Sequence, residues 1–96
     1  MNETQRTSIA DKFRNTQLGF LRIKKNLEIT EFTDFETEKH LKNIILSTPL
    51  ESIERKGKNY YFICSEFNTV LTINAYTLTI ITAKKVSRFQ KEKILI

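Results

Sequence analysis

The chain has 96 residues, which corresponds to one small domain with a limited core. Its composition, 40% hydrophobic and 28% charged, is typical of a soluble globular protein, and no apolar run approaches the ~18 residues that span a bilayer. A single cysteine excludes an intrachain disulfide, and one cysteine with one histidine cannot supply the ligands of a structural zinc site. We therefore expect a cytoplasmic protein with no membrane segment, no metal and no other cofactor.

The formal net charge of +5 is distributed unevenly along the chain. Residues 84–96 contain five basic side chains and one acidic side chain, whereas residues 28–38 contain five acidic side chains and no basic one. A basic balance is typical of proteins that bind nucleic acid or acidic proteins, but it also keeps a small domain in solution. Both interpretations stay open from composition alone.

The first part of the chain has the apolar period of helices. We expect residues 1–6 to be frayed and residues 7–27 to form a helical region, in which Gly19 favours a break near residues 15–16. With that break, the second piece runs over about residues 17–26. The stripe expected to face the core comprises Ile9, Phe13, Phe20, Ile23 and Leu27.

A second helix is predicted over residues 33–48. Thr33 followed by Glu36 is a capping-box pair, and Pro49 ends the helix because proline disfavours helical geometry in the residue before it. The acidic residues near the start suit the helix dipole, so we interpret them as structural and not as a metal site. The expected buried stripe comprises Thr37, Leu41, Ile44, Ile45 and Thr48.

After this helix the apolar period changes to two, which predicts an antiparallel sheet over residues 52–83. In its last strand, Ile80 and Ala83 are expected on opposite faces, and residues 84–96 form a basic tail or a short helix. The fold class is therefore α+β: two N-terminal helices packed on one face of a three- or four-stranded antiparallel meander, in a single domain over residues 1–96. Turn residues divide the sheet into strands at 52–56, 59–64, 69–73 and 78–83.

No strong catalytic motif is present. His40 lies mid-helix and is interpreted as a surface or boundary residue, and Cys64 ends a strand and is interpreted as a small core residue. Basic residues interleaved with aromatic ones remain, and these suit RNA recognition, in which cations meet phosphates and rings stack on unpaired bases. In the competing interpretation, the rings belong to the core and the lysines only solubilise a turn. No catalytic residue is assigned. The candidate binding residues are Arg22, Lys24, Arg55, Lys56, Lys58, Tyr60, Tyr61, Lys84, Lys85 and Arg88.

Several separated motifs stand in a fixed order in the chain: LGFLRIKKNL, NIILSTP, KGKNYYF and LTINAYTLTIITA. Together they resemble the small bacterial proteins grouped as domain of unknown function 3781. The resemblance covers about residues 18–85. The name of that family implies no activity.

The order of elements is also similar, more faintly, to that of RelE and barnase-like toxin ribonucleases. That resemblance implies that Arg22 faces the sheet, with Lys58, Tyr61 and Thr82 as phosphate and base contacts. Many such toxins have a histidine before this arginine, and this chain has none there. Its absence argues against general acid–base chemistry.

Two functional hypotheses follow, and the poor inventory of acid–base groups favours binding over catalysis without settling whether the protein is an enzyme. In the first, the domain contacts RNA or a nucleoprotein through a basic and aromatic face, as a binding protein or as a toxin-like ribonuclease. In the alternative, it is a non-enzymatic protein inhibitor of a host nucleic-acid enzyme, encoded by a phage or mobile element as anti-CRISPR proteins are. A homodimer formed through an exposed strand edge or through the apolar end of the tail is a further possibility.

Overall fold

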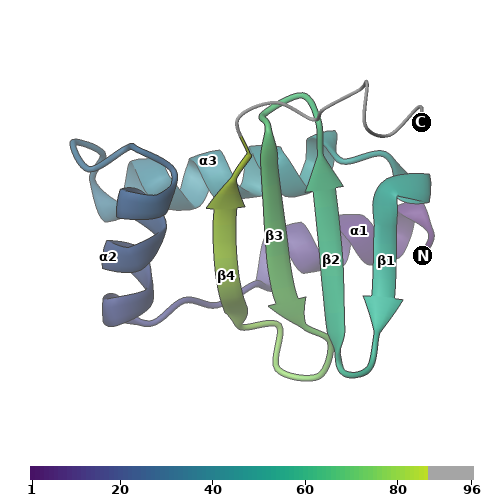
Figure 1. Cartoon of the computed structure of the whole chain (residues 1–96). Coiled ribbons are helices and arrows are strands. Elements are labelled where there is room, and N and C mark those ends of the chain that lie inside the picture. Colours follow the sequence, from purple (N-terminus) through teal and green to yellow (C-terminus); the bar gives the residue numbers. More distant parts are fainter. Residues whose placement is uncertain (87–96) are drawn as a thin grey trace.

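A computed structural model describes residues 1–86 and contains three α-helices followed by a four-stranded antiparallel sheet (Figure 1). The order β1-β2-β3-β4 in the sheet confirms the predicted meander and the α+β class. No helix within these residues is both long enough and apolar enough to cross a membrane. The elements are α1 (Glu3–Lys12), α2 (Gln17–Asn26), α3 (Asp34–Ser47), the 3₁₀ helix η1 (Leu50–Ser52), β1 (Ile53–Lys56), β2 (Asn59–Cys64), β3 (Thr69–Asn74) and β4 (Ile80–Lys85).

In the N-terminal region the first helix begins earlier than predicted, and the predicted break separates it from α2, whose bounds agree with the expected second piece. Residues 1–6 are not frayed, since Asn2 and Gln5 form a capping box with hydrogen bonds of 2.8 and 3.0 Å. The break suggested by Gly19 is present, because the Thr16 hydroxyl accepts the Gly19 backbone N–H at 2.9 Å and starts α2. The described chain thus has three α-helices before the sheet, not two.

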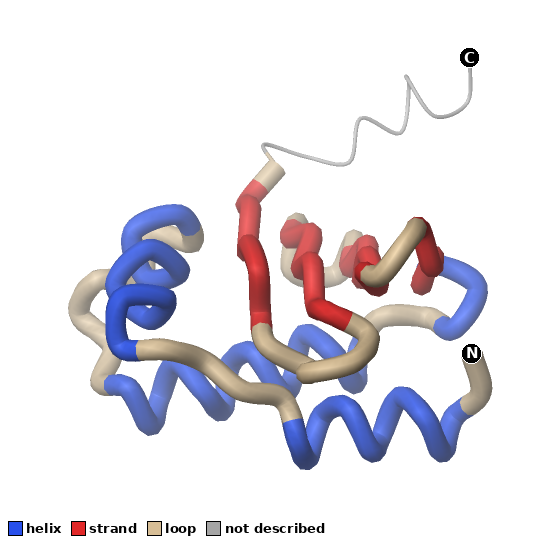
Figure 2. Tube along the Cα trace, turned by 90° about the horizontal axis from the view of Figure 1, so that it is seen from below, coloured by secondary structure: helices blue, strands red, loops and turns tan. Residues whose placement is uncertain are grey.

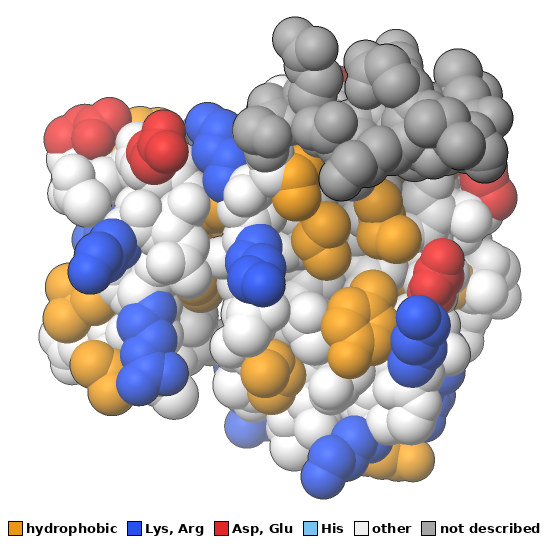
Figure 3. All heavy atoms as spheres, viewed as in Figure 1, with side chains coloured by type: hydrophobic (Ala, Val, Ile, Leu, Met, Phe, Trp, Pro, Cys, Tyr) orange, Lys and Arg blue, Asp and Glu red, His pale blue; other side chains and the backbone are white. Residues whose placement is uncertain are grey.

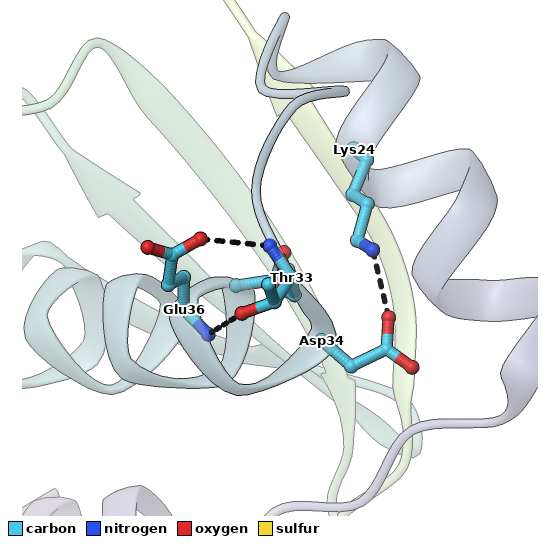
Figure 4. Close-up of polar contacts among 5 residues, drawn as sticks. Lys24, Thr33, Asp34 and Glu36 are labelled. Atoms are coloured by element: carbon cyan, nitrogen blue, oxygen red, sulfur yellow. Dashed lines mark hydrogen bonds and ion pairs between the residues drawn. The ribbon is translucent and has the colours of Figure 1, made fainter.

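The helices occupy two different places around the sheet (Figure 2). Helices α1 and α3 cover one face, whereas α2 stands beside β4, and no helix of residues 1–86 covers the opposite face. The linker between α1 and α2 also lies against this strand, because the Arg14 backbone exchanges hydrogen bonds with Leu78 and Ile80 at 2.9 and 3.0 Å. An ion pair of 2.7 Å between Lys24 and Asp34 joins α2 to the start of α3 (Figure 4).

Helix α3 begins with the cap that its sequence predicts. The Thr33 hydroxyl accepts the Glu36 backbone N–H at 3.1 Å, and the Glu36 carboxylate accepts the Thr33 backbone N–H at 2.8 Å (Figure 4). The predicted buried stripe is confirmed, since each member has a relative exposure of 0%. Those members are Thr37, Leu41, Ile44, Ile45 and Thr48.

The core lies between the helices and the sheet, where strand alternation points apolar side chains toward α1 and α3. Phe62 and Cys64 from β2, with Leu71 and Ile73 from β3, are completely buried there. Tyr60 precedes them on the same face of β2 and packs against this core, and Cys64 is a small core residue.

Strand β4 departs from the prediction because it starts two residues later and contains a register irregularity opposite Thr72 and Ile73. A bulge places an extra residue in one strand, which resets the alternation beyond it. Ile80 and Ala83 therefore both face the core, while Ile81 is half exposed. Lys84 and Lys85 belong to β4, and the rest of the predicted tail, residues 87–96, lies outside the described residues.

Candidate functional site

The structure spreads the candidate binding residues across the molecule and does not gather all of them into one patch. Helix α2, which carries Arg22 and Lys24, stands beside β4 at one edge of the sheet (Figure 1). Lys58 lies in the turn between β1 and β2, the two strands of the sheet that are farthest from β4 in the strand order. Apolar periodicity predicts which side chains of a strand share a face, but it does not predict at which face or edge of the sheet a helix packs.

The remaining candidates are divided between the two faces of the sheet. Tyr61 and Lys84 line a shallow depression on the open face, together with Asn59, Val70, Thr72, Ile81 and Thr82. Lys85, next along β4, lies near His40 of α3, whose pKa it helps to lower. Arg88 lies outside the described residues.

The densest group of predicted residues lies where the β1–β2 turn meets the β3–β4 turn, a region that we call the hairpin end. It comprises Arg55, Lys56, Lys58, Tyr60 and Tyr76 with the backbone between them. The two turns are joined directly, because the Ala75 backbone N–H donates to the Lys58 carbonyl oxygen at 2.8 Å. Gly57 makes the first turn possible, since its φ of +59° is a left-handed conformation that side chains disfavour.

Arg55 is held between two tyrosine rings at the hairpin end. Its guanidinium carbon lies 5.3 Å from the centroid of the Tyr60 ring and 5.4 Å from that of Tyr76, which are cation–π distances. Its Nε donates to the Gly57 carbonyl oxygen at 2.8 Å, and an Nη donates to the Tyr76 hydroxyl at 3.2 Å. Other guanidinium N–H groups remain for an anion, because arginine has more donors than these two bonds use.

Tyr76 is exposed and yet fixed in position. Its relative exposure is 75%, the highest among the exposed large hydrophobic side chains of residues 1–86. Below it, the Asn74 side-chain oxygen accepts the backbone N–H groups of Tyr76 and Thr77 at 2.8 and 2.9 Å, which closes a tight Asx-type turn. The ring is thus presented to solvent on a rigid turn with a cation packed against it.

Two lysines, Lys56 and Lys58, belong to the same end of the molecule as this ring. Lys58 is exposed, and none of the ion pairs found within residues 1–86 includes it. Lys56 faces Glu54 at 3.7 Å, but both side chains are mostly in solvent, where such a pair contributes little. Figure 3 shows Lys and Arg side chains at this lower end of the molecule. The region therefore combines net positive charge with an exposed aromatic ring.

Sequence reasoning missed Tyr76 and chose Tyr60 and Tyr61 instead. Tyr60 faces the helical side of the sheet, packs against the core and meets the Phe62 ring edge-on at 6.4 Å between centroids. Tyr76 sits in the turn Asn74–Thr77, which separates two predicted strands and was assigned no binding residue. The available signal was the aromatic residue itself, because a large ring in a polar hairpin turn has little core to enter.

The arrangement that the toxin resemblance implies is only partly assembled. Arg22 and Thr82 line one groove between α2 and β4, and Thr82 also borders the depression that contains Tyr61. Lys58, in the turn between β1 and β2, lines neither of these two hollows. The constellation therefore lacks one of its proposed phosphate contacts.

Comparison with known proteins decides the family. Residues 7–84 match the family described as “Protein of unknown function (DUF3781)”. The chain belongs to the DUF3781 family. In this DUF3781 protein the match extends from the middle of α1 into β4, which confirms the resemblance carried by the separated motifs. No curated protein and no solved structure matches the chain, so the similarity to RelE and barnase-like toxins stays a prediction.

Proposed function

We propose that this DUF3781 protein binds single-stranded RNA at the hairpin end, where Tyr76 stacks on an unpaired base and Lys56, Lys58 and Arg55 meet the flanking phosphates. The single observation that carries the proposal is the exposed Tyr76 ring, held in place by Arg55. A ring in this position contributes little to the core. Stacking on a base would remove it from water.

Preorganisation makes such a ring effective. A free tyrosine side chain loses rotamer freedom on binding, which costs roughly 0.5–1.5 kcal/mol for an immobilised side chain. The contacts of Tyr76 with Arg55 and the turn below it remove part of that cost in advance. Base–aromatic stacking contributes about 1–3 kcal/mol per base and tolerates different bases, so we expect affinity without strong sequence preference.

The first test measures affinity by fluorescence anisotropy with a labelled single-stranded RNA of mixed sequence. The dissociation constant should rise steeply with salt, because lysine contacts to phosphates release counterions. Tyr76→Ala should weaken binding by about tenfold or more, as expected from the loss of one stacked base. Tyr76→Phe, which keeps the ring and loses only the hydroxyl contact to Arg55, should retain most of the affinity.

Charge variants complete the test. Lys58→Ala should weaken binding to all RNA sequences by a similar factor. It should also reduce the slope of log K against log salt concentration by about one, which corresponds to the loss of one phosphate contact. Lys42→Ala is the matched control, because Lys42 lies on α3 and pairs with Asp11 at 3.2 Å, away from the hairpin end. No binding at low salt, or equal affinity of the parent protein and Tyr76→Ala, would overturn the proposal.

A further inference from the structure

The outer face of α2 carries large apolar side chains that are mostly exposed. Leu18 and Leu21 have relative exposures of 59% and 62%, although the same helix buries Ile23 on its inner face. Across from α2, Ile81 of β4 is 50% exposed because the bulge turns it away from the core. These three aliphatic side chains lie on neighbouring elements that flank one groove.

That groove runs between α2 and β4 and has a volume of about 270 Å³. Its lining includes residues from the cap of α2 at Thr16 to its last residue, Asn26, so it follows the whole helix, a length of about 15 Å. Figure 3 shows the hollow between α2 and the sheet, with hydrophobic and basic side chains on its α2 side. We call the groove with its flanking side chains the α2–β4 surface. Its groove-lining apolar and basic residues are Leu18, Arg22, Ile23, Ile80 and Ile81, and it also includes Leu21 and Lys25 from the adjacent exposed face of α2.

The charge of the α2–β4 surface has one sign. Arg22 and Lys25 are exposed on the same outer face as Leu18 and Leu21, at helical spacings of three and four. Neither occurs in the ion pairs found within residues 1–86, whereas neighbouring Lys24 is neutralised by Asp34. No acidic residue from the described part of the chain lines the groove. A ligand with carboxylates beside apolar side chains would complement both the positive charge and the apolar side chains of this surface.

We infer that the α2–β4 surface binds an acidic amphipathic helix of a partner protein, which lays leucine-like side chains into the groove and carboxylates against Arg22 and Lys25. A nucleic acid fits less well, because no aromatic ring of the described residues lines the groove and aliphatic side chains do not stack bases. The helix-in-groove mode matches the length and shape of the hollow. The inference concerns a surface away from the hairpin end and does not depend on RNA binding there.

The probe is a synthetic helical peptide of about 15 residues with leucines at positions i, i+3, i+4 and i+7 and glutamates elsewhere. Its partner peptide has the same leucines with lysines in place of the glutamates. Amide chemical shifts of the ¹⁵N-labelled full chain report both affinity and location. The glutamate peptide should shift amides of residues 16–26 and 79–83, and the lysine peptide should bind at least about tenfold more weakly.

Variants separate the apolar contribution from the charge. The double variant Leu18→Gln, Leu21→Gln should bind the glutamate peptide about tenfold or more weakly. The control variant is Leu46→Gln, at a position on α3 that is 37% exposed, and it should bind this peptide with unchanged affinity. Arg22→Glu with Lys25→Glu should reverse the preference between the two peptides. All of these positions are exposed, so the parent spectrum serves as the check that each variant folds.

Three outcomes would overturn the inference. The first is equal affinity of the parent protein for both peptides, and the second is absence of shifts along α2 and β4 at millimolar peptide. The third is self-association: the mass measured by sedimentation rises toward that of a dimer as the protein concentration increases, whereas the Leu18→Gln, Leu21→Gln double variant stays monomeric. In that case the surface joins two copies of this chain.

Discussion

His40 shows how burial changes the chemistry of one residue. Its ring lies between Phe32 and Phe67, with centroid distances of 5.9 and 5.3 Å and nearly perpendicular planes. Burial, and secondarily the positive charge of Lys85, lowers the pKa of His40 below its ordinary value of 6.5. The neutral imidazole therefore acts as an aromatic packing unit, at a half-buried position that agrees with the boundary residue predicted for this helix.

This shift predicts a pH dependence of stability. As the pH falls through about 6.5, the unfolded chain binds a proton at His40 that the folded protein does not yet bind, so the free energy of unfolding decreases. Above that pH the contribution of neutral His40 is fully present. Urea unfolding midpoints at pH values of about 7.5 and 5.5 should show the loss. His40→Phe keeps an aromatic ring between Phe32 and Phe67 and should remove the decline, and an equal decline in that variant would assign it to other groups.

Among the elements, helix caps set the residues at which α1, α2 and α3 begin. The capping boxes of α1 and α3 satisfy backbone N–H groups that a helix start leaves without partners. The capping box of α3 could be predicted from the sequence, because Thr33 and Glu36 are residue types that this motif prefers at these two positions. The box of α1 uses Asn2 and Gln5, which precede Ile9, the first residue of the apolar stripe, so apolar spacing alone places the start of this helix too late.

The N-terminal cap of α3 predicts a measurable change in the free energy of unfolding. Thr33→Ala removes the acceptor for the Glu36 N–H and should lower the free energy of unfolding by about 1 kcal/mol, while Thr33→Ser should keep most of it. The measurement is the urea midpoint at unchanged m-value. The matched control is Thr7→Ala, because Thr7 is an exposed threonine in the body of α1 and caps no helix. A loss in Thr7→Ala as large as in Thr33→Ala would contradict the capping role.

Across the domain, one core joins the helices to the sheet. Ile9 of α1 is 5% exposed and belongs to the same buried cluster as Leu41 of α3 and Phe62 of β2. The Arg6 guanidinium adds a second link, because it donates to the Thr48 carbonyl oxygen at the end of α3 at 2.8 Å. The N-terminal helix is therefore part of the folding unit and not an appendage.

This shared core predicts cooperative loss of stability. Ile9→Ala should reduce the free energy of unfolding by about 2–5 kcal/mol, because it leaves a cavity between α1 and the rest of the core. Leu18→Ala, at a position that is 59% exposed, should change it by less than about 0.5 kcal/mol. Far-UV circular dichroism and tyrosine fluorescence should report the same midpoint in both variants. Separate midpoints for the two probes would show that α1 unfolds independently of the sheet.

The features that could be predicted before folding are those with local signals. The period-two alternation of residues 59–64, the buried stripe of α3 and the Thr33 cap each depend on residues a few positions apart. Three features needed the folded chain: the bulge that turns Ile81 outward, the position of α2 beside β4, and the meeting of two hairpin turns that fixes Tyr76 against Arg55. They depend on contacts between residues distant in the chain, and no short-range pattern records which distant partner a side chain will meet.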